Sequence, residues 1–222
     1  MASSRQRAGE TLTLTGLLGG SFNPAHRGHR RITCFAIDYL GLDECWWLVS
    51  PGNPLKSDSG MAPLPARFAT ARRQAVRAPI RVSAMEREFA TRFTVDTLAK
   101  IQRRWPKRRF VWLMGADNLA QFHRWKDWRR LARMVPIAVI ARPGYDAFAI
   151  ASPAMAWLGR YRRSAASLKR PAQWSAPALV ILRFDPDPRS ATAIRRADPM
   201  WDRHIAVRSL RDAVTHRRIN LS

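Results

Sequence analysis

Cysteine is scarce in this chain: Cys34 and Cys45 are the only two among 222 residues. Two cysteines cannot build the multi-bridge framework of a small secreted domain, and their scarcity favours a reducing compartment. Long apolar runs are missing too, so no segment is long enough to span a bilayer. The apolar residues that follow Arg5 and Arg7 are few and lead to no small-residue cleavage site, which argues against a targeting segment. We therefore expect a cytoplasmic protein with no membrane association.

Acidic residues and lysine are also in short supply. Asp and Glu number 16 against 39 Lys and Arg, only five of those 39 are Lys, and the formal net charge is +23. A positive charge of this size is typical of proteins that bind nucleic acid. The arginines are scattered, however, and the chain has no basic tail, zinc-finger spacing or RNA-binding aromatic motif. Arginine-rich coding bias in an enzyme with anionic substrates is the favoured interpretation, with no specific nucleic acid expected. A basic nucleic-acid-binding protein is the alternative of another class.

The most informative stretch begins where an apolar segment ends. Leu12–Leu18 alternates Thr with Leu and then turns fully apolar, which is typical of a strand that enters a buried parallel sheet. Gly19 and Gly20 follow, and their lack of side chains lets a polyanion approach the backbone N–H groups. Apolar residues then recur at helical spacing between positions 32 and 40. His26 and His29 therefore lie near a helix start, where free amides and the helix dipole favour an anion.

Two simpler interpretations of these residues exist. A Gly-Gly pair can be an ordinary turn, and two His residues with Cys34 and Cys45 nearby could bind zinc. Zinc sites need more ligands at compact spacing, and the two Cys fall among the apolar positions of a helix and at the start of an apolar strand. The combination of strand, Gly-Gly, turn and H-x-G-H is far more specific than its parts. It favours a phosphate site, and we expect no metal ligands from the protein.

The stretch resembles the nucleotidyltransferases that carry the pattern G-G-[ST]-F-[DN]-P-x-H-x-G-H. The resemblance implies a doubly wound, Rossmann-like α/β fold with a mostly parallel sheet, and transfer of a nucleotidyl group from a nucleoside triphosphate with release of pyrophosphate. It implies ATP contacts for Gly19, Gly20, Ser21 and Phe22, and an acceptor contact for Asn23. The length suits a single domain, which we place at residues 11–222 after a disordered tail at residues 1–10.

Later motifs narrow the resemblance to the nicotinate mononucleotide adenylyltransferases. The loop after a predicted strand at 45–49 holds Asn53 and Lys56, which the resemblance makes ligands of the acceptor and the triphosphate. Residues 92–98 resemble the family's S/T-Y-T-x-D-T-[LM], in which Thr94 contacts the pyridine nucleotide. Thr94 is also a good helix N-cap. Arg92 and Phe93 depart from the family pattern, which has a small residue and Tyr at these two positions.

A further strand at 110–114 leads to the family's G-x-D-x-[LM] followed by spaced aromatics. Gly115 lets the backbone approach a ribose, and Asp117 can accept hydrogen bonds from ribose hydroxyls. Phe122 and Trp128 are expected in the core. By resemblance, the indole of Trp125 stacks on the nicotinate ring, for which a flat π-surface is suited.

The last motif, at 189–195, resembles I-S-[AS]-T-x-I-R. Ser190 can cap a helix whose first turn, with Thr192, faces the nucleotide, and Arg195 then reaches the phosphates. From 197 to 219 the apolar spacing of Trp201, Leu210 and Val214 predicts a closing helix. Residues 146–176 predict only a helical or irregular excursion without an assigned function.

The resemblance thus implies that AMP passes from ATP to nicotinate mononucleotide in NAD biosynthesis, giving nicotinate adenine dinucleotide and pyrophosphate. Phosphopantetheine or nicotinamide mononucleotide is the alternative acceptor. The acceptor's phosphate attacks the α-phosphorus in line, so no enzyme nucleophile is needed. Four residues are expected to stabilise the developing charge: His26, His29, Lys56 and Arg195. Mg²⁺ is expected to come with ATP, held by phosphate oxygens and water. The sequence leaves homo-oligomerisation open.

Overall fold

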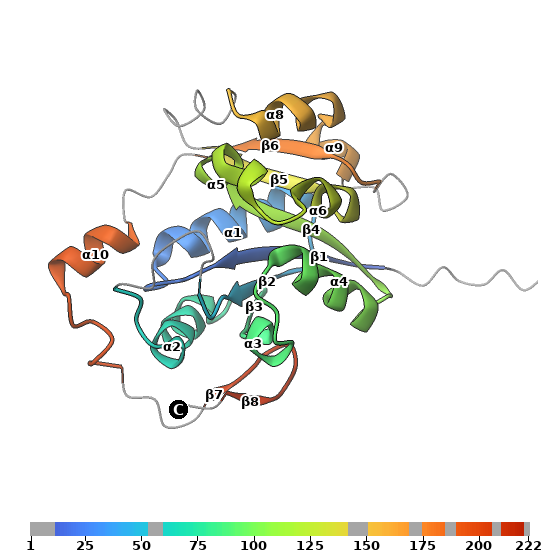
Figure 1. The fold of residues 1–222 in the computed structure, drawn as a ribbon. Helices are drawn as coiled ribbons and strands as arrows, with labels where there is room; N and C mark the ends of the chain where they lie inside the picture. The colour runs from blue at the N-terminus through green and yellow to red at the C-terminus, as the bar shows by residue number, and fades with distance from the viewer. Residues whose placement is uncertain are drawn as a thin grey trace, which may run out of the picture.

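The computed structural model describes residues 12–52, 60–141, 151–168, 175–184, 190–205 and 210–219. The predicted tail at 1–10 lies outside these residues. The centre of the fold is a six-stranded parallel sheet with the order β3-β2-β1-β4-β5-β6 (Figure 1). Its strands are β1 (Thr13–Gly20), β2 (Glu44–Val49), β3 (Ile80–Ser83), β4 (Arg108–Gly115), β5 (Ile137–Ala141) and β6 (Leu179–Arg183). This order reverses between β1 and β4, which confirms the doubly wound prediction.

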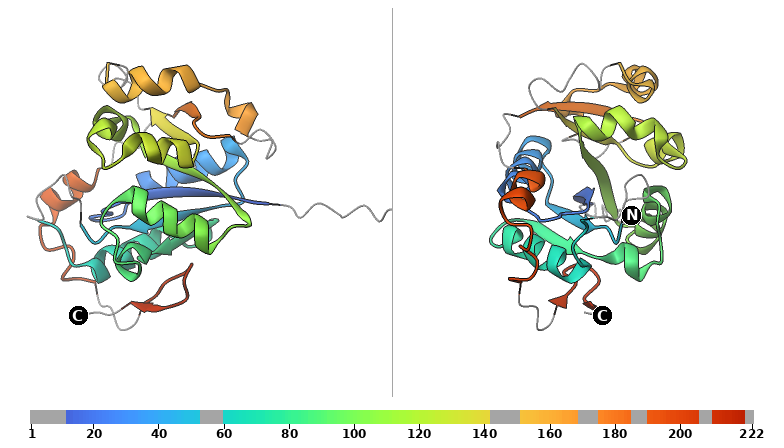
Figure 2. Two further views of the ribbon diagram at one scale, coloured as in Figure 1. Left: turned by 45° about the vertical axis from the view of Figure 1, so that its right-hand side comes forward. Right: turned by 60° about the vertical axis from the view of Figure 1, so that its left-hand side comes forward.

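Each strand buries alternate side chains on opposite faces of the sheet. Leu14 and Leu18 of β1 belong to one apolar cluster, whereas Leu17 belongs to the other. The first cluster packs under α1 (Arg27–Leu40), α2 (Leu64–Ala75) and α9 (Ala165–Leu168). The second packs under α4 (Thr94–Arg104), α5 (Ala116–Gln121), α6 (Trp128–Met134) and α8 (Pro153–Leu158). Figure 2 shows the resulting helix–sheet–helix layers. Strands buried on both faces account for the continuous apolar runs in the sequence.

Helix α1 begins beside His26, as its sequence predicts. His26 is the N-cap residue, and Gly41 ends the helix with a φ of 68°, a left-handed conformation that glycine adopts without steric cost. The helix therefore starts directly after the glycine loop that leaves β1. Its free N-terminal amides face the carboxyl edge of the sheet.

Two predictions about helix ends are wrong. Thr94 is the first helical residue of α4 and not its N-cap, because Phe93 takes the extended N-cap conformation and supplies no side-chain bond. The helix predicted over 197–219 does not form. Helix α10 (Ala191–Ala197) stops before Pro199, whose ring disfavours helical conformation in the residue before it. In the described residues after it, turns lead to an antiparallel pair of short strands, β7 (Leu210–Arg211) and β8 (Arg218–Ile219).

The C-terminal pair is fastened to the main domain by a buried carboxylate. Asp212 Oδ2 accepts hydrogen bonds from Ser83 Oγ at 2.8 Å and from the backbone N–H of Ala84 at 2.7 Å. Its Oδ1 accepts the N–H groups of Val214 and Thr215. These bonds hold the end of β3 and the start of α3 (Met85–Glu88) in place.

The excursion after β5 is helical where it is described. It contains α8, the 3-10 helix η2 (Gly159–Tyr161) and α9. Phe122 is fully buried and Trp128 packs on the same cluster, so both are core residues as predicted. The described helices include none that is long and apolar enough to cross a membrane.

Candidate active site

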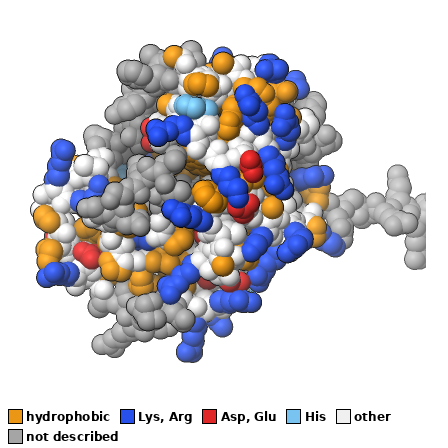
Figure 3. Space-filling model, in the orientation of Figure 1, with side chains coloured by type: hydrophobic (Ala, Val, Ile, Leu, Met, Phe, Trp, Pro, Cys, Tyr) orange, Lys and Arg blue, Asp and Glu red, His pale blue; other side chains and the backbone are white. Residues whose placement is uncertain are grey.

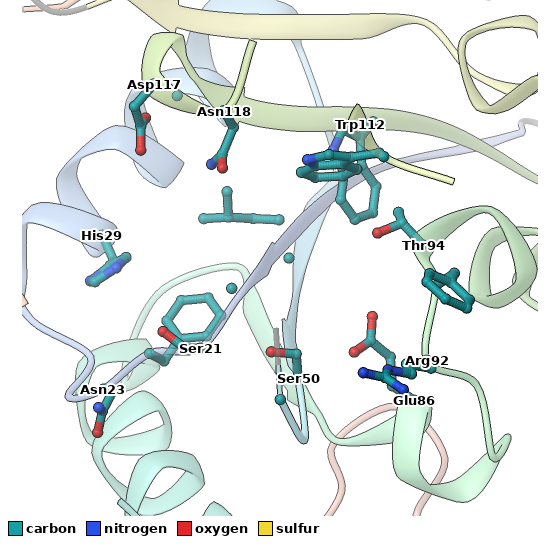
Figure 4. A pocket seen from close by; sticks show the side chains of 18 of the residues that line it. Ser21, Asn23, His29, Ser50, Glu86, Arg92, Thr94, Trp112, Asp117 and Asn118 are labelled. Atoms are coloured by element: carbon teal, nitrogen blue, oxygen red, sulfur yellow. The ribbon is translucent and has the colours of Figure 1, made fainter. Parts of the chain in front are cut away.

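A cleft with a volume of about 390 Å³ opens at the carboxyl ends of β1 and β4 (Figure 4). Ligands of open α/β sheets bind at this point because the two strands connect to helices on opposite faces. The cleft is lined by residues from β1 and its loop, α1, the loop after β2, α3, the start of α4, β4, α5, and the 3-10 helix η1 (Phe122–Arg124) with the residues after it. Ten of the predicted site residues line it: Gly19, Gly20, Ser21, Phe22, Asn23, His29, Thr94, Gly115, Asp117 and Trp125.

The glycine loop turns sharply at Phe22. This residue has a positive φ of 47°, a strained conformation for a bulky side chain. The turn directs its ring into the core, where it stacks on Trp47 with centroids 5.0 Å apart and lies 5.0 Å from the His29 ring. The ring of Phe22 thus supports the face from which His29 points into the cleft.

The two histidines cap α1 reciprocally. Nδ1 of His26 accepts the N–H of Gly28 at 3.1 Å, and Nδ1 of His29 accepts the N–H of His26 at 3.2 Å. Since both Nδ1 atoms accept, a neutral ring carries its proton on Nε2, where it can be donated. Their centroids are 4.0 Å apart, but only His29 lines the cleft, while His26 is buried beside it.

Hydrogen bonds from neighbouring segments hold the loop between β1 and α1 in place. Both polar atoms of the Asn23 side chain bind backbone, with Nδ2 donating to Gly60 O at 2.8 Å and Oδ1 accepting from Ala62 N–H at 3.2 Å. Asn23 therefore fastens the loop as well as lining the cleft. The buried guanidinium of Arg67, on α2, donates to the carbonyl oxygens of the loops around the site: Ala62, Ser21, Ser50 and Pro51. The sequence analysis did not identify Arg67. An arginine on the apolar face of a predicted helix could have indicated a buried guanidinium with backbone partners.

The opposite end of the cleft is aromatic. The indole of Trp125 packs roughly perpendicular to Trp112, with centroids 6.2 Å apart, and to Phe122, with centroids 5.3 Å apart, so two neighbours fix its plane. Thr94 faces the same end from the start of α4 (Figure 4). Because Thr94 is not an N-cap, its hydroxyl is not engaged in capping the helix.

Close packing inside the protein favours glycine at positions 19 and 115. A Cβ at Gly19 would lie 2.9 Å from the Trp112 ring. A Cβ at Gly115 would lie 2.3 Å from Asp117 Oδ1, so the glycine makes room for that carboxylate to reach the cleft. That Gly115 lets the backbone approach a ribose stays a prediction. In the structure, Gly115 leaves space for the carboxylate of Asp117.

The remaining predicted residues are placed as follows. Ser190 caps α10 as predicted, accepting the N–H of Ala193 at 3.1 Å. Arg195 donates to Thr192 Oγ1 and to the carbonyl oxygen of Asn23, so α10 is joined to the first loop. These three residues do not line the cleft, although Ala191 does. Asn53 and Lys56 lie outside the described residues.

Sequence reasoning also missed Glu86, which lines the cleft from α3. It is only 8% exposed, and burial raises the pKa of its carboxyl from 4.5 to about 7. No local motif marks this residue. It enters the site because β3 ends beside β2 and the chain turns there into α3.

The chain matches the model of the cytidylyltransferase-like family over residues 17–197. A protein of Erythrobacter litoralis is 66% identical over 205 residues, covering 92% of this chain and 94% of the relative, and is named "Probable nicotinate-nucleotide adenylyltransferase". A protein of Bradyrhizobium sp. with the same name is 48% identical over 84% of this chain and 97% of its own length.

The fold resembles the nicotinic acid mononucleotide adenylyltransferase of Plasmodium falciparum, solved in complex with NaAD. The TM-score is 0.60 and the identity 15%, with 83% of each chain covered. Residues 17–197 contain the glycine loop, both histidines and Arg195. From the family model and the relatives of this identity, the chain belongs to the cytidylyltransferase-like family and, within it, to the nicotinate-nucleotide adenylyltransferases.

Proposed function

We propose that this chain transfers AMP from ATP to nicotinate mononucleotide, forming nicotinate adenine dinucleotide and pyrophosphate, and that the cleft at β1 and β4 is where it does so. The observation that carries the proposal is the division of one cleft into two chemically different ends. One end has a glycine loop, a helix N-terminus and an imidazole, which suit phosphate. The other end has Thr94 and the fixed indole of Trp125, which suit a pyridine ring.

The reaction needs positioning and charge stabilisation. An oxygen of the acceptor phosphate attacks the α-phosphorus of ATP, the new P–O bond forms, and the bond to the departing pyrophosphate breaks. We assign His29 Nε2–H as a donor to the phosphates as charge develops. His26 holds the loop and adds a second imidazole at this end, and Lys56 and Arg195 supply cationic charge. Gly19, Gly20 and Ser21 contact ATP through the backbone, and Asp117 accepts from its ribose.

In this proposal, the metal ion enters the cleft bound to the phosphates of ATP. The described residues contain no group of three or more His, Cys, Asp or Glu that could hold a metal. A Mg²⁺ ion that retains several water ligands and binds phosphate oxygens of ATP would fit such a cleft. Asp117 is the carboxylate that could bind one of those waters. We therefore propose MgATP as the substrate. A cytoplasmic location is also proposed, which the free thiols of Cys34 and Cys45 support.

A pyrophosphate-release assay with ATP and a panel of acceptors tests this function. We expect nicotinate mononucleotide to exceed nicotinamide mononucleotide in kcat/KM by about a hundredfold, because two mismatched polar contacts cost about 1–3 kcal/mol each. Phosphopantetheine should not react. Comparable efficiency on the two pyridine nucleotides would overturn the assignment to the nicotinate branch.

The distribution of charge on one face of the molecule does not single out a nucleic-acid site. Lys and Arg side chains are spread over the face seen in Figure 3, and carboxylates lie among them. Salt-dependent retention of duplex DNA or RNA without any pyrophosphate release would support that alternative.

A further inference from the structure

The side chain of Glu86 is largely buried in the wall of the cleft, and its carboxyl faces the cleft without a partner among the described residues. The residue is 8% exposed and lines the cleft, and among the described residues no hydrogen bond or ion pair reaches its carboxyl oxygens. Its backbone carbonyl, by contrast, accepts bonds from the N–H and hydroxyl of Thr91. A largely buried carboxyl that no protein group contacts is costly unless a molecule in the cleft hydrogen-bonds to it. Its position therefore points to a ligand group that completes it.

The surrounding structure fixes Glu86 where it is. Asp212 holds Ala84, the residue before α3, through the 2.7 Å bond to its N–H, and Thr91 holds the backbone carbonyl of Glu86 itself. Met85, which precedes Glu86, is fully buried in the core cluster on that face of the sheet. The backbone that carries this carboxyl is therefore held in place by hydrogen bonds. Glu86 lies on the same side of the cleft as Thr94 and Arg92 (Figure 4).

The charged groups around this carboxyl leave it unneutralised. Five such residues line the cleft from other elements: His29, Arg92, Asp117, Arg124 and Lys126. None of them lies within ion-pair distance of Glu86. Lys126 pairs with Asp96 instead, at 3.0 Å. On α3 itself, Glu88 pairs with Arg104 and Arg217 outside the cleft, and Arg87 is exposed.

We propose that Glu86 contacts the substituent on the acceptor's pyridine ring and distinguishes a carboxylate from a carboxamide there, an inference that rests on the proposed function. As a neutral acid, its O–H donates one hydrogen bond to the nicotinate carboxylate. When ionised, it repels that carboxylate and accepts a hydrogen bond from a carboxamide NH₂. Thr94, on the same wall, supplies a second polar contact to the substituent.

The burial of Glu86 sets the pH at which this preference changes. Desolvation alone raises its pKa to about 7, so the acid form prevails below that pH and the carboxylate above it. Nicotinate binding requires the acid form. Above pH 7, binding must therefore carry a proton into the site.

The test measures proton uptake and acceptor preference together. Calorimetric titration of the wild-type enzyme with nicotinate mononucleotide at pH 7.5, in two buffers of different ionisation enthalpy, should show uptake of a fraction of a proton that Glu86→Gln does not take up. The wild-type preference for nicotinate over nicotinamide mononucleotide in kcat/KM should fall about tenfold from pH 6 to pH 8. In Glu86→Gln the preference should not change with pH. Because both acceptors carry the same phosphate, its titration cancels in the ratio.

Glu88→Gln, on the same helix but outside the cleft, is the matched control and should keep the wild-type pH dependence. A wild-type preference that does not vary with pH would overturn the proposal, as would equal proton uptake in wild type and Glu86→Gln. A Glu86→Gln enzyme with KM raised equally for both acceptors would place the carboxyl at the ribose and also overturn it. If wild-type enzyme released pyrophosphate with neither pyridine nucleotide, the proposed function itself would fail. The wild-type titration needs no variant to fold.

Discussion

The guanidinium of Arg195 donates a hydrogen bond of 2.6 Å to the backbone carbonyl oxygen of Asn23, across 172 positions of the chain. This bond ties α10 to the glycine loop at the phosphate end of the cleft. Arg195 also donates to Thr192 Oγ1 at 3.3 Å, so its guanidinium is held against its own helix. The helix that closes the family motif and the loop that opens it therefore form one edge of the site.

Replacing Arg195 by Ala should raise the KM for ATP about tenfold or lower kcat by a similar factor, since one charge-assisted contact contributes about 1.5–3 kcal/mol. Steady-state kinetics with varied ATP measures this effect. Arg196→Ala, an exposed neighbour on the same helix, is the control and should be near wild type. Normal turnover in Arg195→Ala, accompanied by loss of DNA retention, would instead favour a nucleic-acid role for this residue.

His29→Ala should lower kcat by about a hundredfold or more with the fold intact, because its donor acts on charge that develops in the transition state. Circular dichroism would verify the fold, and saturating kinetics would give kcat. His204→Ala removes an exposed imidazole, paired with Asp198 at 3.9 Å, and serves as control. A folded His29→Ala enzyme with near-normal kcat would refute the assigned role.

Arg67→Met tests whether the site loops depend on one buried guanidinium. Its loss leaves the carbonyl oxygens of Ser21, Ser50 and Pro51 without their donor. We expect a loss of about 3 kcal/mol in the free energy of unfolding, measured with urea, and a lower kcat/KM. Arg72→Met, at an exposed position of the same helix, should change neither. Unchanged stability in Arg67→Met would show that water replaces these bonds without cost.

Glu86 should also make stability depend on pH. Its pKa in the folded protein, about 7, lies above its ordinary 4.5, so the folded state holds the proton more tightly. Its stability contribution is complete below pH 4.5 and is lost as pH rises through 7. From pH 5 to pH 9 the wild type should therefore lose up to about 3 kcal/mol of unfolding free energy relative to Glu86→Gln. Urea titrations of both proteins across this range would measure the difference, and a constant difference would exclude a buried, proton-linked carboxyl.

The sequence predicted what local patterns determine. The apolar strand and the helical spacing after His26 predicted β1 and α1 correctly, because each depends on neighbours in the chain. The boundary was wrong by two residues, since Gly19 and Gly20 end β1 and do not begin the loop. The predicted helix over 197–219 failed for the opposite reason. Trp201 and Val214 do bury their side chains, but against parts of the chain far away in sequence, so their spacing carried no helical information.

The candidate site was predictable only where a motif marks it. The wall that carries Glu86 is held by Asp212, whose bond to Ala84 spans 128 positions. Arg67 reaches the loop after β1 and the loop after β2 from the apolar face of a helix. An arginine on an apolar helix face signals that Arg67 is buried, but it does not indicate its partners. Nothing local marks Glu86 or its link to Asp212, since strand order and helix packing bring these residues together. The shift of the α4 N-cap from Thr94 to Phe93 is smaller, and follows from backbone conformation that side-chain preference does not fix.

Trp125 provides the sharpest test of the acceptor end, because ring stacking and substituent recognition can be separated. Its indole packs roughly perpendicular to Trp112 and Phe122, and it lines the cleft where a pyridine can reach it. Trp125→Ala should raise the KM for nicotinate mononucleotide about tenfold or more, the equivalent of about 1.4 kcal/mol of stacking. The KM for ATP should change much less, and Trp125→Phe should recover part of the loss. Since the indole stacks on either pyridine ring, the ratio of nicotinate to nicotinamide efficiency should survive in Trp125→Ala. Equal losses for ATP and acceptor would place Trp125 in the framework of the cleft and not against the ring.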